Sequence, residues 1–229
     1  MRSGSREAPE TEPMSSDSRQ ASAAQPMAGD GAADDPRPTL SRALGQAGMV
    51  IAHVTPDQAS HPTPCESWDV QALGNHLING LNRFRATVAG EKVDWGAPVP
   101  NVEGEWATVF HDRADALTAA WAAVPDIDAK RPSPMGELTM SFIASQQIAE
   151  IAQHTWDLAA ATGQRDILDD AIAADALAWT RGALSPEFRG PEASGKSFGE
   201  VRPVDADAPM CDQLAAFFGR DPAFVGDPA

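Results

Sequence analysis

The pattern of apolar residues changes at about residue 39. Residues 1–38 contain no aromatic residue and no Ile, Leu or Val, and they are rich in Ser, Ala, Pro, Asp and Glu. Such a segment cannot bury enough apolar surface to offset the entropy lost when a chain becomes ordered. We therefore predict a disordered acidic tail over residues 1–38 and a single folded domain over residues 39–229.

Beyond this point, apolar residues recur three or four positions apart, which is the period of an amphipathic α-helix. Stretches rich in Pro and Gly separate the periodic segments. Four long helices are predicted, at about residues 39–54, 67–90, 103–124 and 139–162. Shorter helical patterns follow at about residues 168–184 and 209–218. The fold class is therefore all-α, with a four-helix core on which extra C-terminal helices pack.

Local signals support the ends of these helices. Thr39 or Ser41 can cap the first helix and Ser67 the second, because their hydroxyl groups accept hydrogen bonds from free backbone N–H groups. Gly163 is a typical residue just after a helix C-terminus.

Composition excludes several classes of function. The formal net charge is −16 and the chain has only three Lys, which argues against nucleic acid because phosphate binding needs clustered cations. No apolar run is long enough to cross a membrane, and no signal peptide is visible. Cys65 and Cys211 are too few for a disulfide framework. A cytoplasmic location is expected, without membrane or nucleic-acid partners.

Three residues form a candidate metal site. Glu150 and His154 are four positions apart, so on a helix they leave the same face one turn apart. His76, on the second predicted helix, would be the third ligand. Two His and one carboxylate leave a coordination position open, as in catalytic zinc sites. The alternatives are a hydrogen-bonded core histidine at position 76 and a solvated Glu–His pair on the helix surface.

Three strings of residues resemble one known family. They are TPCESWDV at residues 63–70 followed by His76, EIAQHTWDLAAATG at residues 150–163, and FFGRDP at residues 217–222. The chain is similar to actinobacterial metal-binding proteins related to the N-terminal domain of mycothiol-dependent maleylpyruvate isomerase, within the DinB-like superfamily. This resemblance implies a four-helix bundle that holds a divalent metal, commonly zinc. The matching ligand positions are His76, Glu150 and His154.

The resemblance also implies a function. We expect a metal-dependent, mycothiol-dependent S-transferase or thiol-assisted isomerase that acts on a small electrophile, with the thiol activated as a metal-bound thiolate. Its partners would be that electrophile and a low-molecular-weight thiol, and the chain would be a monomer or homodimer. The alternative is a non-catalytic metal- or ligand-binding module. Maleylpyruvate isomerase has a further C-terminal domain, whereas this chain has a short region after Gly163 in which we assign no basic residue to the site.

Other residues carry open interpretations. Cys65 is a candidate nucleophile, but its place between Pro64 and a helix start favours a packing or loop role. Asp157 is either an acceptor that orients His154 from behind or a solvated carboxylate. Trp68 is expected to pack in the core or at the helix start.

Overall fold

The computed structural model describes residues 35–66, 68–133, 136–191, 196 and 198–226. Residues 1–34 of the predicted tail lie outside the described residues, so the disorder expected there stays a prediction. Helix α1 begins at Arg37 rather than Thr39, and neither Thr39 nor Ser41 is its cap. Pro36 stands at the N-cap and Pro38 lies in the first turn, where a fixed φ suits a helix and a missing N–H costs nothing.

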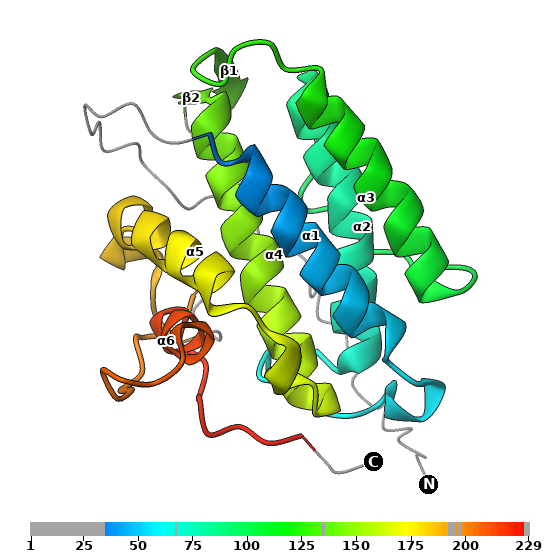
Figure 1. Cartoon of the computed structure of the whole chain (residues 1–229), viewed down its shortest axis with the longest axis vertical. Helices are drawn as coiled ribbons and strands as arrows, with labels where there is room; N and C mark the ends of the chain where they lie inside the picture. Colours follow the sequence, from blue (N-terminus) through cyan, green and yellow to red (C-terminus); the bar gives the residue numbers. More distant parts are fainter. Residues whose placement is uncertain (1–34, 67, 134–135, 192–195, 197, 227–229) are drawn as a thin grey trace, which may run out of the picture.

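Four long helices form the body of the molecule, and this confirms the predicted all-α fold (Figure 1). They are α1 (Arg37–Ala52), α2 (Val70–Ala89), α3 (Trp106–Ala122) and α4 (Met140–Thr162). Helices α1 and α2 each pack against both α3 and α4, so the four enclose one apolar core. Their apolar faces meet inside because each repeats with the helical period.

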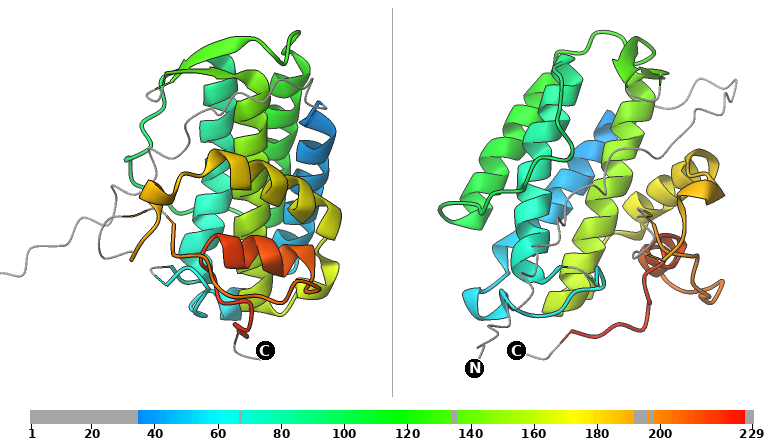
Figure 2. Two further views of the ribbon diagram at one scale, coloured as in Figure 1. Left: turned by 90° about the vertical axis from the view of Figure 1, so that its left-hand side faces the viewer. Right: turned by 180° about the vertical axis from the view of Figure 1, so that it is seen from behind.

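Two further helices cover the outer side of α4. They are α5 (Asp170–Ala183) and α6 (Met210–Phe217), and the views in Figure 2 place both beside the bundle. Helix α4 is therefore covered on most sides, and residues 151–161 are all buried. Polar side chains in that stretch need partners inside the protein. Within the described part of the chain, no helix is both long and apolar enough to cross a bilayer.

The connections contain elements that the periodicity did not predict. A small antiparallel sheet of two strands, β1 (Lys130–Ser133) and β2 (Gly136–Thr139), precedes α4. Its strands are short and mostly exposed, so they lack the alternating apolar pattern that reveals a strand. Single turns of 3₁₀ helix occur at η1 (Pro56–Gln58), η2 (Arg165–Ile167) and η3 (Pro186–Phe188).

The start of α2 differs from the prediction in a way that shapes the site. Asp69 is the N-cap, and its side chain accepts a hydrogen bond of 2.8 Å from the backbone N–H of Ala72. The predicted cap, Ser67, lies outside the described residues. The preceding loop is held by Thr63, whose hydroxyl donates to the backbone oxygen of Trp68 at 2.7 Å. These bonds place Trp68 beside the first turns of α2.

Candidate metal centre

The structure brings the three predicted ligands together from two neighbouring helices. Glu150 and His154 lie on consecutive turns of α4, and His76 lies on the second turn of α2. One carboxylate oxygen, Oε1 of Glu150, is 3.5 Å from Nε2 of His76 and 3.3 Å from Nε2 of His154. The three ligand atoms all lie within 4.8 Å of one another.

This spacing fits a divalent ion. Two ligand atoms that each stand about 2.1 Å from a tetrahedral ion are about 3.4 Å apart, close to the two distances found here. The side chains of both histidines are only 9% exposed, whereas that of Glu150 is 32% exposed. The triad therefore opens to solvent on the side of Glu150, where a fourth ligand can enter.

The charges of the triad are strongly coupled. Burial raises the pKa of Glu150, but the two histidines outweigh burial and lower it. Burial lowers the pKa of His154, but the carboxylates of Glu150 and Asp157 outweigh burial and raise it well above its ordinary value. Burial lowers the pKa of His76, and the charge of His154 adds to this effect. The two carboxylates that flank His154 therefore favour the charged form of its ring, whereas burial favours the neutral form of His76.

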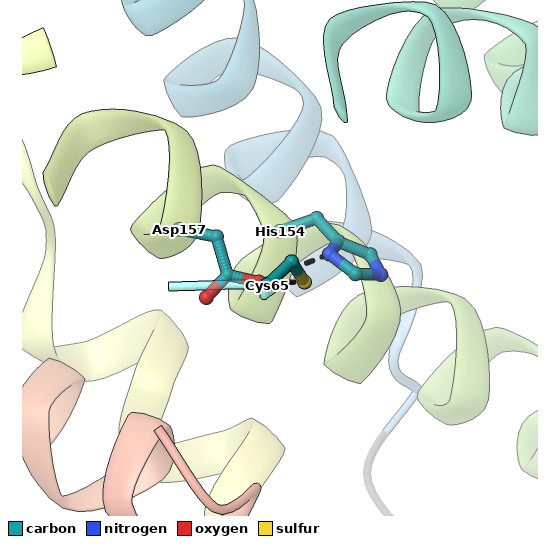
Figure 3. A group of neighbouring side chains, drawn as sticks. All are labelled: Cys65, His154 and Asp157. Atoms are coloured by element: carbon teal, nitrogen blue, oxygen red, sulfur yellow. Dashed lines mark hydrogen bonds and ion pairs between the residues drawn. The ribbon is translucent and has the colours of Figure 1, made fainter. Parts of the chain in front are cut away.

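Asp157 and Glu150 lie beside different ring nitrogens of His154: Asp157 is next to Nδ1 (Figure 3) and Glu150 is next to Nε2. Nδ1 of His154 donates to Oδ2 of Asp157 at 3.1 Å. The carboxylate is fully buried, so it is not the solvated residue that the sequence left possible. An ionised carboxylate only accepts hydrogen bonds, so Nδ1 carries the proton and the Nε2 lone pair can face an ion.

A second group of potential ligands, Cys65, His154 and Asp157, shares this histidine (Figure 3). The Arg220 guanidinium already lies there, with Nη2 2.7 Å from the Cys65 sulfur and Nε 2.9 Å from Asp157 Oδ1. Burial raises the pKa of Asp157, but Arg220 and His154 outweigh burial and lower it to about 2. A cation is thus in place, and this group does not fit a second metal ion.

Trp68 forms one wall of the triad. Its ring centroid is 4.5 Å from that of His76 and 5.6 Å from that of His154. The contact limits rotation of both imidazoles and keeps water from that side. The sequence predicted packing for Trp68, but not that the ring packs on both candidate ligands.

The other candidates lie away from the ligand atoms or are engaged. Burial and Asp157 raise the pKa of Cys65, which favours the neutral thiol and a packing role over a nucleophile. The Nδ1 atoms of His53 and His111 bond to carbonyls of their own helices, and both residues are exposed. Trp156 is buried and donates to Asp212, as expected of a packing residue.

Sequence reasoning missed Arg220. We assigned no basic residue after Gly163 to the site, yet Arg220 reaches Asp157. The one hint in the sequence was the string at residues 217–222, which is among the three strings that resemble the family. Nothing in its spacing or periodicity indicated that it lies near α4.

Comparison with known proteins gives one family and two close relatives. The profile of the mycothiol maleylpyruvate isomerase N-terminal domain matches residues 40–159, slightly more than half of the chain. Two uncharacterized proteins of Mycobacterium tuberculosis, from strains CDC 1551 / Oshkosh and ATCC 25618 / H37Rv, are each 34% identical over 188 residues. The alignment covers 81% of this chain and 98% of each relative. No solved structure matches.

Proposed function

Because this chain belongs to the family of the mycothiol maleylpyruvate isomerase N-terminal domain, we propose that it is a metal-dependent thiol transferase or thiol-assisted isomerase. His76, Glu150 and His154 are the proposed metal ligands. The observation that carries the proposal is a pair of distances: Oε1 of Glu150 lies 3.5 Å from Nε2 of His76 and 3.3 Å from Nε2 of His154, close to the ligand separation of a tetrahedral site. Zinc is the proposed metal because it accepts imidazole and carboxylate ligands in this arrangement.

A divalent ion at this site would supply an open position at which a thiol loses its proton near neutral pH. The protein's own residues prepare that position. Asp157 holds the ring of His154 in one orientation, and Trp68 packs on the side of the two imidazoles. Glu150 lies at the open side, so thiol and electrophile would meet there. Mycothiol is the proposed thiol because the family takes its name from mycothiol maleylpyruvate isomerase.

A non-catalytic metal- or ligand-binding module is the second candidate. Cys65 and Asp157, the other reactive groups beside the triad, are both engaged by Arg220, which suits a site that binds without turnover. Hydrolysis by a metal-activated water has less support. Glu150 is a proposed ligand and Asp157 is paired with a cation, so neither is available as a general base.

Metal content tests the proposal first. We would measure it by mass spectrometry on protein purified without metal-affinity resin, for wild type, Glu150→Ala and the exposed control Glu91→Ala. We expect about one divalent ion per chain in wild type and in the control, and none in Glu150→Ala, because two imidazoles alone hold zinc weakly. Full metal in Glu150→Ala, or none in reconstituted wild type, would contradict the metal centre.

The dependence of melting temperature and turnover on added thiol distinguishes a transferase from a hydrolase and from a binding module. A transferase predicts that mycothiol raises the melting temperature of the metal-loaded protein and not that of the metal-free protein, because the thiol needs the ion. It also predicts consumption of small electrophiles only when the thiol is present. Turnover without thiol indicates hydrolysis. A thiol-dependent melting shift with no turnover across a panel of electrophiles favours the binding module.

A further inference from the structure

Arg220 joins the C-terminal segment to the residues behind the triad. It lies just after α6, beyond the residues that the family profile matches. Its Nε donates to Oδ1 of Asp157 at 2.9 Å, and its Nη2 donates to Oδ2 at 3.2 Å. Nη2 also lies 2.7 Å from the sulfur of Cys65. One guanidinium therefore bridges three segments that are far apart in the sequence.

These contacts fix the plane of the Asp157 carboxylate. Besides the two bonds from Arg220, Oδ1 accepts from Nε2 of Gln153 at 3.1 Å, and Oδ2 accepts from Sγ of Cys65 at 3.3 Å. A guanidinium fork that bonds both oxygens of a carboxylate sets its rotation as well as its position. The fifth contact of this carboxylate is with Nδ1 of His154. Its rotation therefore decides whether His154 has an aligned acceptor.

The backbone around Arg220 is held in place independently of the side chain. Its N–H donates to the backbone oxygen of Ala215 at 2.9 Å, which closes the end of α6. Gly219 has φ of +90° and packs against Gly199, where a Cβ would come within 2.6 Å of the Gly199 Cα. Arg165 donates to the backbone oxygen of Pro222 at 3.0 Å. The backbone that carries the Arg220 guanidinium is therefore held in place by contacts other than those of the guanidinium itself.

We propose that Arg220 is a positioning residue of the metal centre: through Asp157 it holds His154 in the orientation that ligates the ion, so that metal affinity depends on the C-terminal segment. This inference rests on the proposed function, because it assumes that His154 is a ligand. Arg220 does not touch the ion in this role. A Lys at position 220 would supply the charge without the fork and would not restore the alignment.

The test measures zinc affinity by competition with a chelator, for wild type, Arg220→Gln, Arg220→Lys and Arg165→Gln. Arg165 is the matched control, because it anchors the same segment through Asp212 and Pro222 and makes no contact with Asp157. We expect about a 10–100-fold loss of affinity in both Arg220 variants, the usual effect of losing a residue that orients a ligand from behind. The Arg165 variant should stay within about threefold of wild type, even where its melting temperature falls.

If Arg220→Gln does not fold, a second variant that removes both charges of the buried pair can test the inference instead. Removing one partner of a buried ion pair leaves an uncompensated charge, whereas removing both costs less. The double variant Asp157→Asn, Arg220→Gln should fold and show the same loss of zinc affinity. Its cobalt-substituted form should have a visible absorption spectrum different from that of wild type, which a change in stability alone would not produce.

The outcomes separate this inference from the proposed function. Wild-type protein that takes up no zinc contradicts both. Wild-type protein that binds zinc, with equal affinity in folded Arg220→Gln and in the double variant, contradicts the inference and leaves the proposed function standing. An equal loss in Arg165→Gln and Arg220→Gln also contradicts it, since the effect would then come from loosening of the whole segment.

Discussion

At the scale of single residues, the two ring nitrogens of His154 face two carboxylates with different tasks. Nε2 lies 3.3 Å from Glu150, which is a proposed ligand, and Nδ1 lies 3.1 Å from Asp157, which orients the ring. His76 has Glu150 as a partner, but burial dominates and lowers its pKa. The two histidines therefore enter metal binding in different protonation states.

This difference predicts a pH dependence of metal affinity. The raised pKa of His154 favours the form of its ring that is protonated at Nε2 as well as Nδ1, whereas the lowered pKa of His76 favours the neutral ring. An ion must displace the Nε2 proton, so its binding is weaker at low pH and strengthens as pH rises toward the pKa of His154. Chelator competition should show the association constant rising with pH until the ring of His154 has lost its proton, and levelling off above that point. A flat profile would mean that His154 loses no proton on binding.

At the scale of elements, α2 carries two glycines in different surroundings. A Cβ on Gly74 would stand 2.1 Å from the ring of Trp106, the first residue of α3. Because Gly74 has no side chain, the first residue of α3 can pack closely against α2. Gly74 lies two residues before His76. A Cβ on Gly80 would meet no heavy atom within 4 Å. Gly74 thus serves the packing of two helices, and no contact in the described residues requires a glycine at position 80.

Alanine at each position should change stability in opposite directions. Gly74→Ala forces the Trp106 ring to move and should lower the free energy of unfolding by about 1–3 kcal/mol. Gly80→Ala adds helix propensity without a clash and should raise it by up to about 1 kcal/mol. Urea unfolding followed by circular dichroism measures both. If Gly80→Ala destabilised the protein as much as Gly74→Ala, steric contact with Trp106 would not be the cause.

At the scale of the whole molecule, helix α1 begins inside the segment predicted to be a tail. Arg37 belongs to α1, and its Nη1 donates to the backbone oxygen of Val124 at the end of α3, at 3.0 Å. The same side chain pairs with Asp35. The contact joins the first helix of the bundle to the third, so the composition-based boundary at residue 38 cuts into the folded unit.

Two deletions check where the domain begins. Removing residues 1–34 should leave the melting temperature and metal content unchanged, because that segment has no aromatic residue and no Ile, Leu or Val to bury in a core. Removing residues 1–38 also takes the first turn of α1 and the Arg37 contact. It should lower the melting temperature by about 2–4 °C for each kcal/mol lost. A large loss in the shorter deletion would instead show that the tail packs on the domain.

Much of the fold could be predicted from the sequence, because helix formation leaves local marks. Apolar side chains three and four apart define a buried face, and this period revealed all four bundle helices and the two C-terminal ones. The pairing of Glu150 with His154 is local for the same reason, since four residues make about one turn. The ends of helices were less certain. Ser67 and Asp69 are equally suitable caps in sequence, and the loop held by Thr63 decides for Asp69.

What only the tertiary structure decided involves residues far apart in the chain. Local sequence patterns do not show which helix faces pack together. The 3.5 Å distance between Nε2 of His76 and Oε1 of Glu150 therefore depends on the packing of α2 against α4. The same holds for Asp157, for which the sequence left an orienting and a solvated role open: it is fully buried and contacts Cys65 and Arg220 from distant segments. Arg220 is the extreme case. Arg220 and Asp157 are far apart in the sequence, yet they are in contact in the fold. A buried carboxylate is costly without a partner, and here the partner is the Arg220 guanidinium.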